Sequence, residues 1–290
     1  MNIGFRINAG LILILIAILI SGCQPATRSV KTQQPIAALN QEPRIGEQAQ
    51  TTVSEQLIAK YNHVEPQQWG EKVSGVAYRL DTNEKVLALT FDACGGSVRS
   101  NGYDASLVDY LNKEQIPATL FITGKWIDAN PKLFLQLAAN NLFEIGNHGL
   151  NHVPCSVNGK SAYNIKGTVS AAEVIAEIDG NDRKIKLLTG RVPHYYRSGT
   201  NYYDEIAVKI VQDLGYQAIG YSVLGDAGAT FNREQVKKAL LDARAGSIVI
   251  FHFNHPEGDT AEGIMDAIPI LINKGFKFVK LSDFPIITYP

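Results

Sequence analysis

The stretch Val86-Leu87-Ala88-Leu89-Thr90-Phe91 is followed directly by Asp92. A short apolar run of this kind, preceded by turn-forming residues at 81–84, is typical of a strand buried inside a sheet. Asp92 would then lie just past the carboxyl end of that strand, which is where parallel α/β folds collect their functional groups. The stretch therefore predicts a buried strand with a polar residue at the rim of the sheet.

The rest of the chain continues this pattern. Short β-branched and aromatic runs predict strands at 118–123, 143–146, 195–196, 217–223, 248–253 and 276–281. Apolar residues at helical spacing predict helices between them, at 107–111, 133–137, 174–178, 206–214, 236–243 and 264–272. About seven units of strand followed by helix favour parallel strands joined by helical crossovers, either in a barrel or in an open doubly wound sheet.

The residues just past the expected strands decide between these architectures. Polar side chains follow the strands in turn, at Asp92, Asn147-His148, Arg197, Asp226 and His252-Phe253-Asn254-His255. An open sheet would divide such groups between the two sides of a switch point, whereas a barrel brings all of them to one mouth. We therefore expect an α/β fold built as a distorted (β/α) barrel of about seven parallel strands.

Composition limits the class of protein. The chain has 290 residues, of which 45% are hydrophobic and 19% charged, as in ordinary globular proteins and unlike disordered or multi-span membrane chains. A net charge of −1 gives no basic surface for nucleic acid, so we expect no nucleic-acid partner. The 3 cysteines are too few for a disulfide-built scaffold.

The amino terminus has the pattern of a signal peptide, which we assign to residues 1–22. The apolar run 11–20 is too short for a transmembrane helix, which needs about 20 residues. The stretch Leu19-Ile20-Ser21-Gly22-Cys23 resembles a bacterial lipoprotein signal, which implies lipidation of Cys23 and an exported, lipid-anchored protein. By the same resemblance, Gln24 implies the outer membrane if the source has two membranes. A plain secretory signal with a coincidental cysteine is the alternative.

Residues 23–68 are rich in Gln, Thr, Ala, Pro and Glu and contain no sustained apolar period. Such a segment buries too little apolar surface to offset its ordering entropy, so we interpret it as a flexible linker with a short helix near 53–61. The folded domain is expected to span residues 69–290.

Two histidines beyond the strand expected at 143–146 have the spacing of metal ligands. His148 and His152 are four positions apart, so a helical turn would place both imidazoles on one face, where they can bind one zinc ion. The glutamate of the HExxH metalloprotease motif is missing between them, and surface or capping roles are the alternative for the pair.

These residues form an ordered set along the chain. Thr90-Phe91-Asp92, His148 with His152, Arg197, Asp226 and Ile250-Phe251-His252 follow one another at strand ends, and this order resembles the polysaccharide deacetylases of carbohydrate esterase family 4. The resemblance covers residues 85–284. It implies a distorted (β/α) barrel that removes N-acetyl groups from chitin oligomers, peptidoglycan or other amino-sugar polymers, with zinc or a similar divalent ion.

The resemblance also implies a role for each residue. Asp92 is the expected general base, which takes a proton from the attacking water, and Arg197 is expected to orient it. His148 and His152 are the expected metal ligands. Amide hydrolysis needs such a base together with a cation that stabilises the oxyanion.

Two further residues would handle the leaving group. His252 is the expected general acid that protonates the departing nitrogen, and Asp226 is the candidate for the carboxylate that holds its imidazole. The structural alternatives are a strand-end turn acid for Asp92 and a packed core histidine for His252.

Position 93 departs from the family pattern. A second aspartate, which ligates the metal, usually follows the first, but here Asp92 is followed by Ala93. Water, Asp92, a shifted residue or the substrate would then complete the site, and a protein without metal is a further alternative. Zn²⁺ or another divalent ion remains the expected cofactor, with reduced affinity.

Two cysteines flank the expected site. Cys94 lies two residues past Asp92 and Cys155 lies three past His152, so both belong to loops that should meet at the metal. In an exported protein we favour a Cys94–Cys155 disulfide that braces the site, with free thiols and a zinc thiolate as alternatives.

Together these features predict a metal-dependent hydrolase that removes N-acetyl groups from an amino-sugar polymer in the cell envelope. The alternatives are a non-catalytic glycan-binding protein on the same barrel and a hydrolase of small amides. The expected partner is an N-acetylated polysaccharide, with membrane contact through the lipid anchor only, and we expect a monomer.

Overall fold

The structure is a computed structural model of the chain. It describes residues 45–290, with side chains from residue 52 onward. The signal peptide predicted at 1–22, the lipidation site Cys23 and the linker as far as residue 44 lie outside the described residues. Within residues 45–290, no helix is both long and apolar enough to cross a membrane.

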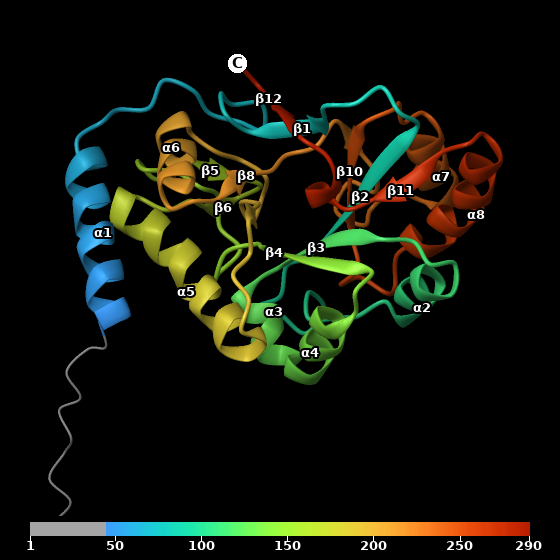
Figure 1. The fold of residues 1–290 in the computed structure, drawn as a ribbon, viewed down its shortest axis with the longest axis horizontal. Helices are drawn as coiled ribbons and strands as arrows, with labels where there is room; N and C mark the ends of the chain where they lie inside the picture. The colour runs from blue at the N-terminus through green and yellow to red at the C-terminus, as the bar shows by residue number, and fades with distance from the viewer. Residues whose placement is uncertain (1–44) are drawn as a thin grey trace, which may run out of the picture. The chain divides into compact units, whose positions relative to one another are not determined.

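A curled sheet of mainly parallel strands forms the centre of the domain (Figure 1). Its strand order is β12-β1-β10-β2-β3-β4-β7-β8, with β11 paired to β2 and β9 paired to β10. The pairs from β10 to β8 are parallel, as are those of β9 and β11, whereas β1 pairs antiparallel with β10 and β12. The bounds are β1 (Ala77–Leu80), β2 (Val86–Ala93), β3 (Ala118–Ile122), β4 (Phe143–Asn147), β7 (Tyr195–Tyr196), β8 (Gln217–Ala218), β9 (Val223–Leu224), β10 (Ser247–His252), β11 (Lys277–Val279) and β12 (Ile286–Thr288).

The two ends of this strand order meet near Ala77. Ala77 in β1 forms a parallel bridge with Ile219, which follows β8, and the Gly220 N–H donates to the Ala77 carbonyl over 2.6 Å. The sheet therefore curls into the distorted (β/α) barrel predicted from the sequence, and this prediction is confirmed. Each stretch predicted to form one of its strands contains a parallel strand.

Helices cover the outside of the sheet (Figure 1). Polar side chains cap several of them; Asp104, for example, accepts from the Leu107 N–H at the start of α2. Helix α3 was not predicted because its 6 residues are too few to show an apolar period. The bounds are α2 (Ala105–Lys113), α3 (Gly124–Ala129), α4 (Pro131–Ala139), α5 (Ala171–Thr189), α6 (Glu205–Asp213), α7 (Arg233–Leu241), α8 (Thr260–Asn273) and the 3₁₀ turn Leu281–Asp283.

Alternation along β2 determines which way its side chains point. One set packs with the helices outside the sheet: Leu87, Leu89, Phe91 and Ala93. Val86 and Ala88 belong instead to the cluster that includes Phe121 and Ile248 from neighbouring strands. Because successive side chains of a strand point to opposite faces, Asp92 shares the inner face with Ala88, at the carboxyl end of the barrel.

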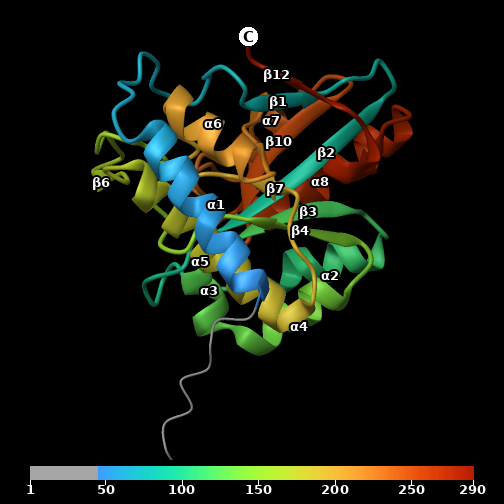
Figure 2. The ribbon, with the colours of Figure 1, turned by 60° about the vertical axis from the view of Figure 1, so that its left-hand side comes forward.

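The folded unit begins earlier than the sequence suggested. Helix α1 (Ile45–Tyr61) lies against α5 and α6 (Figure 2), and the compact unit spans Ile45–Pro290. Leu57 and Tyr61 are buried there, and the Tyr61 hydroxyl donates to Asp213 over 2.8 Å. The linker predicted at 23–68 and the boundary at 69 are therefore wrong from Ile45 onward. The short helix expected near 53–61 is confirmed, but it begins at Ile45, and Leu57, Ile58 and Tyr61 pack it against the domain.

The loop between β4 and α5 carries a small hairpin of β5 (Ser161–Ala162) and β6 (Ile165–Lys166). Tyr163 and Asn164 form its turn, both with positive φ.

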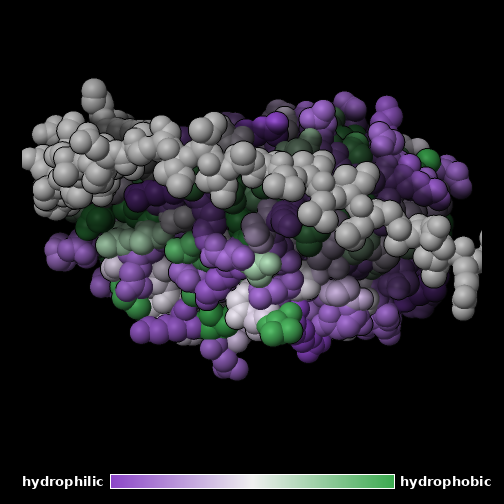
Figure 3. Space-filling view, turned by 90° about the horizontal axis from the view of Figure 1, so that it is seen from below, coloured by the Kyte–Doolittle hydropathy of each residue, from purple (hydrophilic) through white to green (hydrophobic). Residues whose placement is uncertain are grey.

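Seen from below, the coloured surface of the domain is mainly hydrophilic, with small hydrophobic spots between the polar side chains (Figure 3). This is the surface expected where helices bury their apolar side against a sheet.

Candidate active site

Asp92 and Arg197 form a buried ion pair at the carboxyl end of the barrel. Arg197 Nη1 donates to Asp92 Oδ1 over 2.8 Å, and Nη2 donates to the Gly220 carbonyl over 2.9 Å. Arg197 has no exposed surface, and its Cζ lies 4.2 Å from the centroid of the Phe121 ring. Burial alone would raise the pKa of the Asp92 carboxyl, but Arg197, His148 and His252 together outweigh it and lower that pKa. Asp92 is thus kept ionised and fixed in orientation.

His148 follows β4 and is buried beside this pair. Its Nδ1 lies 2.9 Å from the Arg197 carbonyl oxygen, which can only accept, so Nδ1 carries a proton. Nε2 lies 3.5 Å from Asp92 Oδ2. It is buried, and no group within residues 45–290 forms a hydrogen bond with it. The backbone of Arg197 therefore orients His148 with an unpartnered nitrogen toward Asp92.

His152 reaches the same place from a loop. The expected helical turn between His148 and His152 is wrong: this segment is irregular, with φ of 80° at Gly149 and 62° at His152. The two rings still meet, with centroids 5.1 Å apart and planes at 75°. Gly199 explains part of this geometry, because a Cβ on it would lie 2.3 Å from the His152 carbonyl carbon. A side chain at position 199 would push the His152 backbone away.

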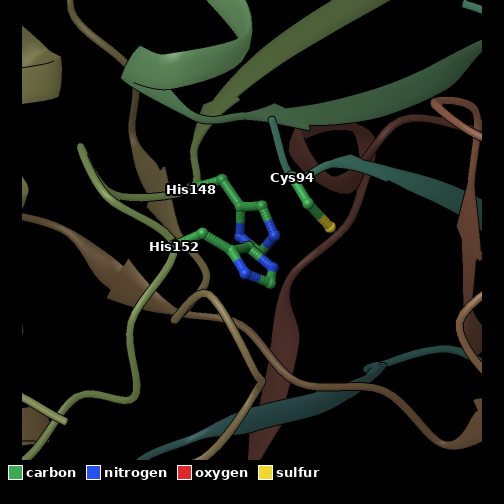
Figure 4. A group of neighbouring side chains, drawn as sticks. All are labelled: Cys94, His148 and His152. Carbon is green, nitrogen blue, oxygen red and sulfur yellow. The ribbon is translucent and has the colours of Figure 1, made fainter. Parts of the chain in front are cut away.

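The expected Cys94–Cys155 disulfide is wrong, because both cysteines are free thiols. Cys155 is buried in the cluster formed with α1, α5 and α6, and its backbone pairs with Tyr202 and Asp204. The Cys94 side chain instead extends into the space shared by His148 and His152 (Figure 4). Burial raises the pKa of the Cys94 thiol, but the imidazoles of His152, His148 and His252 together outweigh this and hold that pKa well below its usual range.

This group fits a divalent metal ion. Cys94 Sγ and one ring nitrogen each of His148 and His152 lie within 4.8 Å of one another. The fit rests on His148 Nε2 in particular, because a buried nitrogen without a hydrogen bond is costly unless something binds its lone pair. The contact between His148 Nδ1 and a backbone carbonyl is the outer contact that usually orients a metal-binding histidine.

His252, at the end of β10, is paired with Asp226. His252 Nδ1 lies 2.9 Å from Asp226 Oδ1, and the His252 N–H donates to Asp226 Oδ2 over 2.7 Å. Thr260 also donates to Oδ2, over 3.1 Å. Burial lowers the pKa of the His252 imidazole, but the Asp226 carboxylate outweighs this and holds that pKa well above its usual value. Nδ1 thus faces the carboxylate, which leaves Nε2 to act as a proton donor.

These side chains open onto one cavity of about 470 Å³. Its lining includes Asp92, Cys94, His152 and His252 from the strand ends. Among the remaining lining residues are Glu71, Tyr163, Tyr221 and His255. The structure thus brings together every predicted catalytic and metal-binding residue, with Arg197, Asp226 and His148 lying directly behind those that line the cavity.

Some residues of this site were missed in the sequence. Glu71 accepts from the Tyr221 hydroxyl over 2.9 Å at the cavity, but it precedes the first strand and carried no pattern. Thr260 lies at the start of α8, where a polar residue usually indicates a cap. Each of these residues belongs to the site through a contact with a residue far away in the sequence. Neither could therefore be assigned to the site from its sequence neighbours.

Several known proteins are similar to this chain in sequence and in fold. A family model described as polysaccharide deacetylase matches residues 79–219. The peptidoglycan-N-acetylmuramic acid deacetylase PdaA of Bacillus subtilis (strain 168) is 27% identical over 234 residues, which cover 77% of this chain and 81% of that protein. The solved structure of Bacillus subtilis PdaA, a family 4 carbohydrate esterase, has a TM-score of 0.59 at 26% identity and covers 79% of this chain and 87% of its own.

A second structural neighbour has the same fold. This CE4 family pseudoenzyme from Bacillus anthracis has a TM-score of 0.60 at 23% identity, and the match covers 71% of this chain and 67% of that one. The order of residues at the strand ends, the curled parallel sheet and these matches agree. Together they make this chain similar to the polysaccharide deacetylases of carbohydrate esterase family 4 in sequence and in fold.

Proposed function

We propose that this protein is a metal-dependent hydrolase that removes N-acetyl groups from an amino-sugar polymer of the cell envelope. One observation carries the proposal: the Asp92 carboxyl, its pKa lowered, and the His252 imidazole, its pKa raised, line the same cavity as the metal-binding group. Hydrolysis of an amide needs a base and an acid at one substrate, in opposite protonation states. Similarity to the polysaccharide deacetylases supports the same reaction.

Asp92 is suited to be the general base. Its contact with Arg197 Nη1 keeps the carboxylate ionised and prevents rotation, so that Oδ2 remains directed toward the metal-binding group. In this position it would take a proton from the attacking water. A base that is fixed in place contributes roughly 10²–10⁴-fold in rate.

His252 is suited to be the general acid. Asp226 binds its Nδ1 and stabilises the imidazolium, so Nε2 carries a proton at neutral pH. This proton would pass to the sugar nitrogen as the bond between nitrogen and carbonyl carbon breaks. An amine leaves far more readily than an amide anion, which makes the transfer necessary.

His148 and His152 would hold the metal ion. When bound, a divalent ion polarises the amide carbonyl and stabilises the negative charge that develops on its oxygen. Arg197 supports this site twice, through its side chain on Asp92 and through its carbonyl on His148. One residue therefore positions the base and a metal ligand together.

The substrate and location are also proposals. The relative PdaA is named for a peptidoglycan sugar, which supports a cell-wall glycan as substrate. The apolar run at 11–20 and Cys23 support export and a lipid anchor, on the outer membrane if the source has two membranes. We propose that the protein acts there as a monomer.

Acetate release from a panel of glycans tests the proposed function. The purified protein, supplied with zinc, is incubated with chitin oligomers and with peptidoglycan fragments, and acetate is measured by NMR. We expect release from at least one of these substrates, and roughly 10²–10⁴-fold less from His252→Ala. Glycan binding without acetate release by the wild-type protein would contradict the proposal and favour the glycan-binding alternative.

A further inference from the structure

The position that usually supplies a third metal ligand in this family does not face the site. Ala93 has no exposed surface and packs in the cluster between the sheet and the helices that cover it. Even a longer side chain there would begin on the wrong face of β2. A third protein ligand from this strand end must therefore come from position 92 or 94, whose side chains share the inner face.

Asp92 is already engaged. Its Oδ1 accepts from Arg197 Nη1 over 2.8 Å, and the pair is almost completely buried. The carboxylate that acts as base would lose its lone pairs to the ion if it were also the principal ligand. Cys94 has no comparable ion pair, and its sulfur lies within 4.8 Å of the ligand nitrogens of both histidines.

The backbone fixes Cys94 in this place. The Thr123 hydroxyl donates to the Cys94 carbonyl over 2.6 Å, and the Thr123 N–H donates to the Ala93 carbonyl over 3.1 Å. The chain then turns at Gly95, where a Cβ would lie 2.4 Å from the Trp126 nitrogen. Cys94 therefore sits in a rigid turn, and its thiol does not depend on a mobile loop for its position.

An independent observation indicates that something binds between these side chains. His148 Nε2 is a buried ring nitrogen, in a side chain only 1% exposed, and within residues 45–290 it forms no hydrogen bond. It faces the same space as the cysteine sulfur (Figure 4). A cation bound there would satisfy both atoms, whereas Asp92 Oδ2 at 3.5 Å does not form a hydrogen bond with Nε2.

We infer that Cys94 is the third protein ligand of the metal and that it binds as a thiolate. The site then consists of two imidazoles and one sulfur, in place of the two imidazoles and carboxylate expected for the family. Thiolate ligands favour zinc and other soft or borderline ions over magnesium, calcium and manganese. Three protein ligands leave one position for water or substrate, as in catalytic zinc sites.

Cobalt substitution tests the sulfur directly. The purified, metal-free protein is titrated with Co²⁺, and the near-ultraviolet absorption is followed for the thiolate-to-cobalt charge-transfer band. We expect this band in the wild-type protein and in Cys155→Ser, which removes the other described thiol but leaves Cys94. We expect it to be lost in Cys94→Ser. A band that persists in Cys94→Ser, or that is missing in wild-type protein with bound cobalt, would overturn the inference.

Affinity for metals tests the same ligand independently of the cobalt band. Competition with a chromophoric chelator should show zinc bound roughly 100-fold more weakly by Cys94→Ser than by wild type, since one of three protein ligands is lost. Cys94→Asp should recover part of the zinc affinity and bind Mn²⁺ more tightly than wild type does. Equal zinc affinity in all three proteins would refute a role for Cys94. Thermal unfolding of each variant identifies any loss of fold.

These measurements use no substrate. The inference rests on the metal site of the proposed function, but a protein that releases acetate from no glycan would still show the cobalt band. Conversely, acetate release by a protein without the band would leave the proposed function standing and exclude Cys94 as a ligand. The two failures are therefore distinguishable.

Discussion

Arg197 Nη1 donates to Asp92 Oδ1 over 2.8 Å, and neither side chain has more than 4% of its surface exposed. A buried pair of this kind is a weak source of stability, because removing two charges from water costs nearly as much as their attraction returns. It does fix protonation and orientation, which a general base requires. The pair is therefore better explained by catalysis than by folding.

Replacing Asp92 by Asn removes the base while keeping the size of the side chain. We expect Asp92→Asn to lower kcat by roughly 10²–10⁴-fold. The Asn carbonyl can still accept from Arg197 but leaves its buried charge without a counter-charge, so we also expect a loss of about 3–5 kcal/mol in the free energy of unfolding. Acetate release and chemical denaturation measure the two effects.

The matched control for Asp92→Asn is Asp128→Asn, which removes an exposed carboxylate from α3. Its activity should equal that of wild type. If Asp92→Asn kept wild-type activity, Asp92 would not be the base.

Replacing Asp226 by Asn tests how His252 is kept protonated. His252 donates a proton, so activity should fall as the pH rises through its pKa, which Asp226 holds well above the usual value. Without the carboxylate this pKa is lower, and the protonated form is lost at a lower pH. We therefore expect the descending limb of the profile of kcat against pH to move to lower pH in Asp226→Asn. If the descending limb of the Asp226→Asn profile lay at the same pH as in wild type, a group other than His252 would be the acid.

Replacing Gly199 by Ala tests the packing behind a metal ligand. The added Cβ would lie 2.3 Å from the His152 carbonyl carbon and 2.5 Å from its Cα, both backbone atoms, so His152 must shift. We expect zinc affinity to fall by roughly 10–100-fold, as for other changes that displace a ligand indirectly. Chelator competition measures this.

Gly215→Ala is the control for Gly199→Ala. Gly215 has positive φ but no atom within 4 Å of an added Cβ, so the substitution strains the backbone without reaching the site. Its zinc affinity should match that of wild type. Equal affinity in Gly199→Ala would mean that the His152 loop accommodates the methyl group.

The barrel could be predicted because strong local patterns specify it. Residues 86–91 form one apolar run, and its alternation of outward and inward side chains places Asp92 at the mouth. The order of Asp92, His148, Arg197 and His252 at strand ends was also visible, since parallel strands bring their carboxyl ends together. The parallel topology therefore predicted that these residues lie close together, although they are far apart in the sequence.

The errors arose where tertiary contacts outweigh local pattern. His148 and His152 meet through a loop with a left-handed residue, although their spacing suggested a helical turn. The position of Cys94 two residues past Asp92 indicated that it lies at the site, but not that its sulfur faces these two imidazoles while Cys155 packs in another cluster. The short helix expected near 53–61 begins at Ile45 in the structure, and the segment before residue 53 has too weak an apolar period to reveal this.

The most direct test of the account is reconstitution of activity with zinc. Metal-free protein is titrated with zinc, and acetate release from a responsive glycan is followed at each ratio, with His152→Ala as the control. We predict negligible release without metal, a linear rise that breaks at about one zinc per chain, and little release by His152→Ala at that ratio. Full activity in the metal-free protein, or wild-type activity in His152→Ala, would contradict the account.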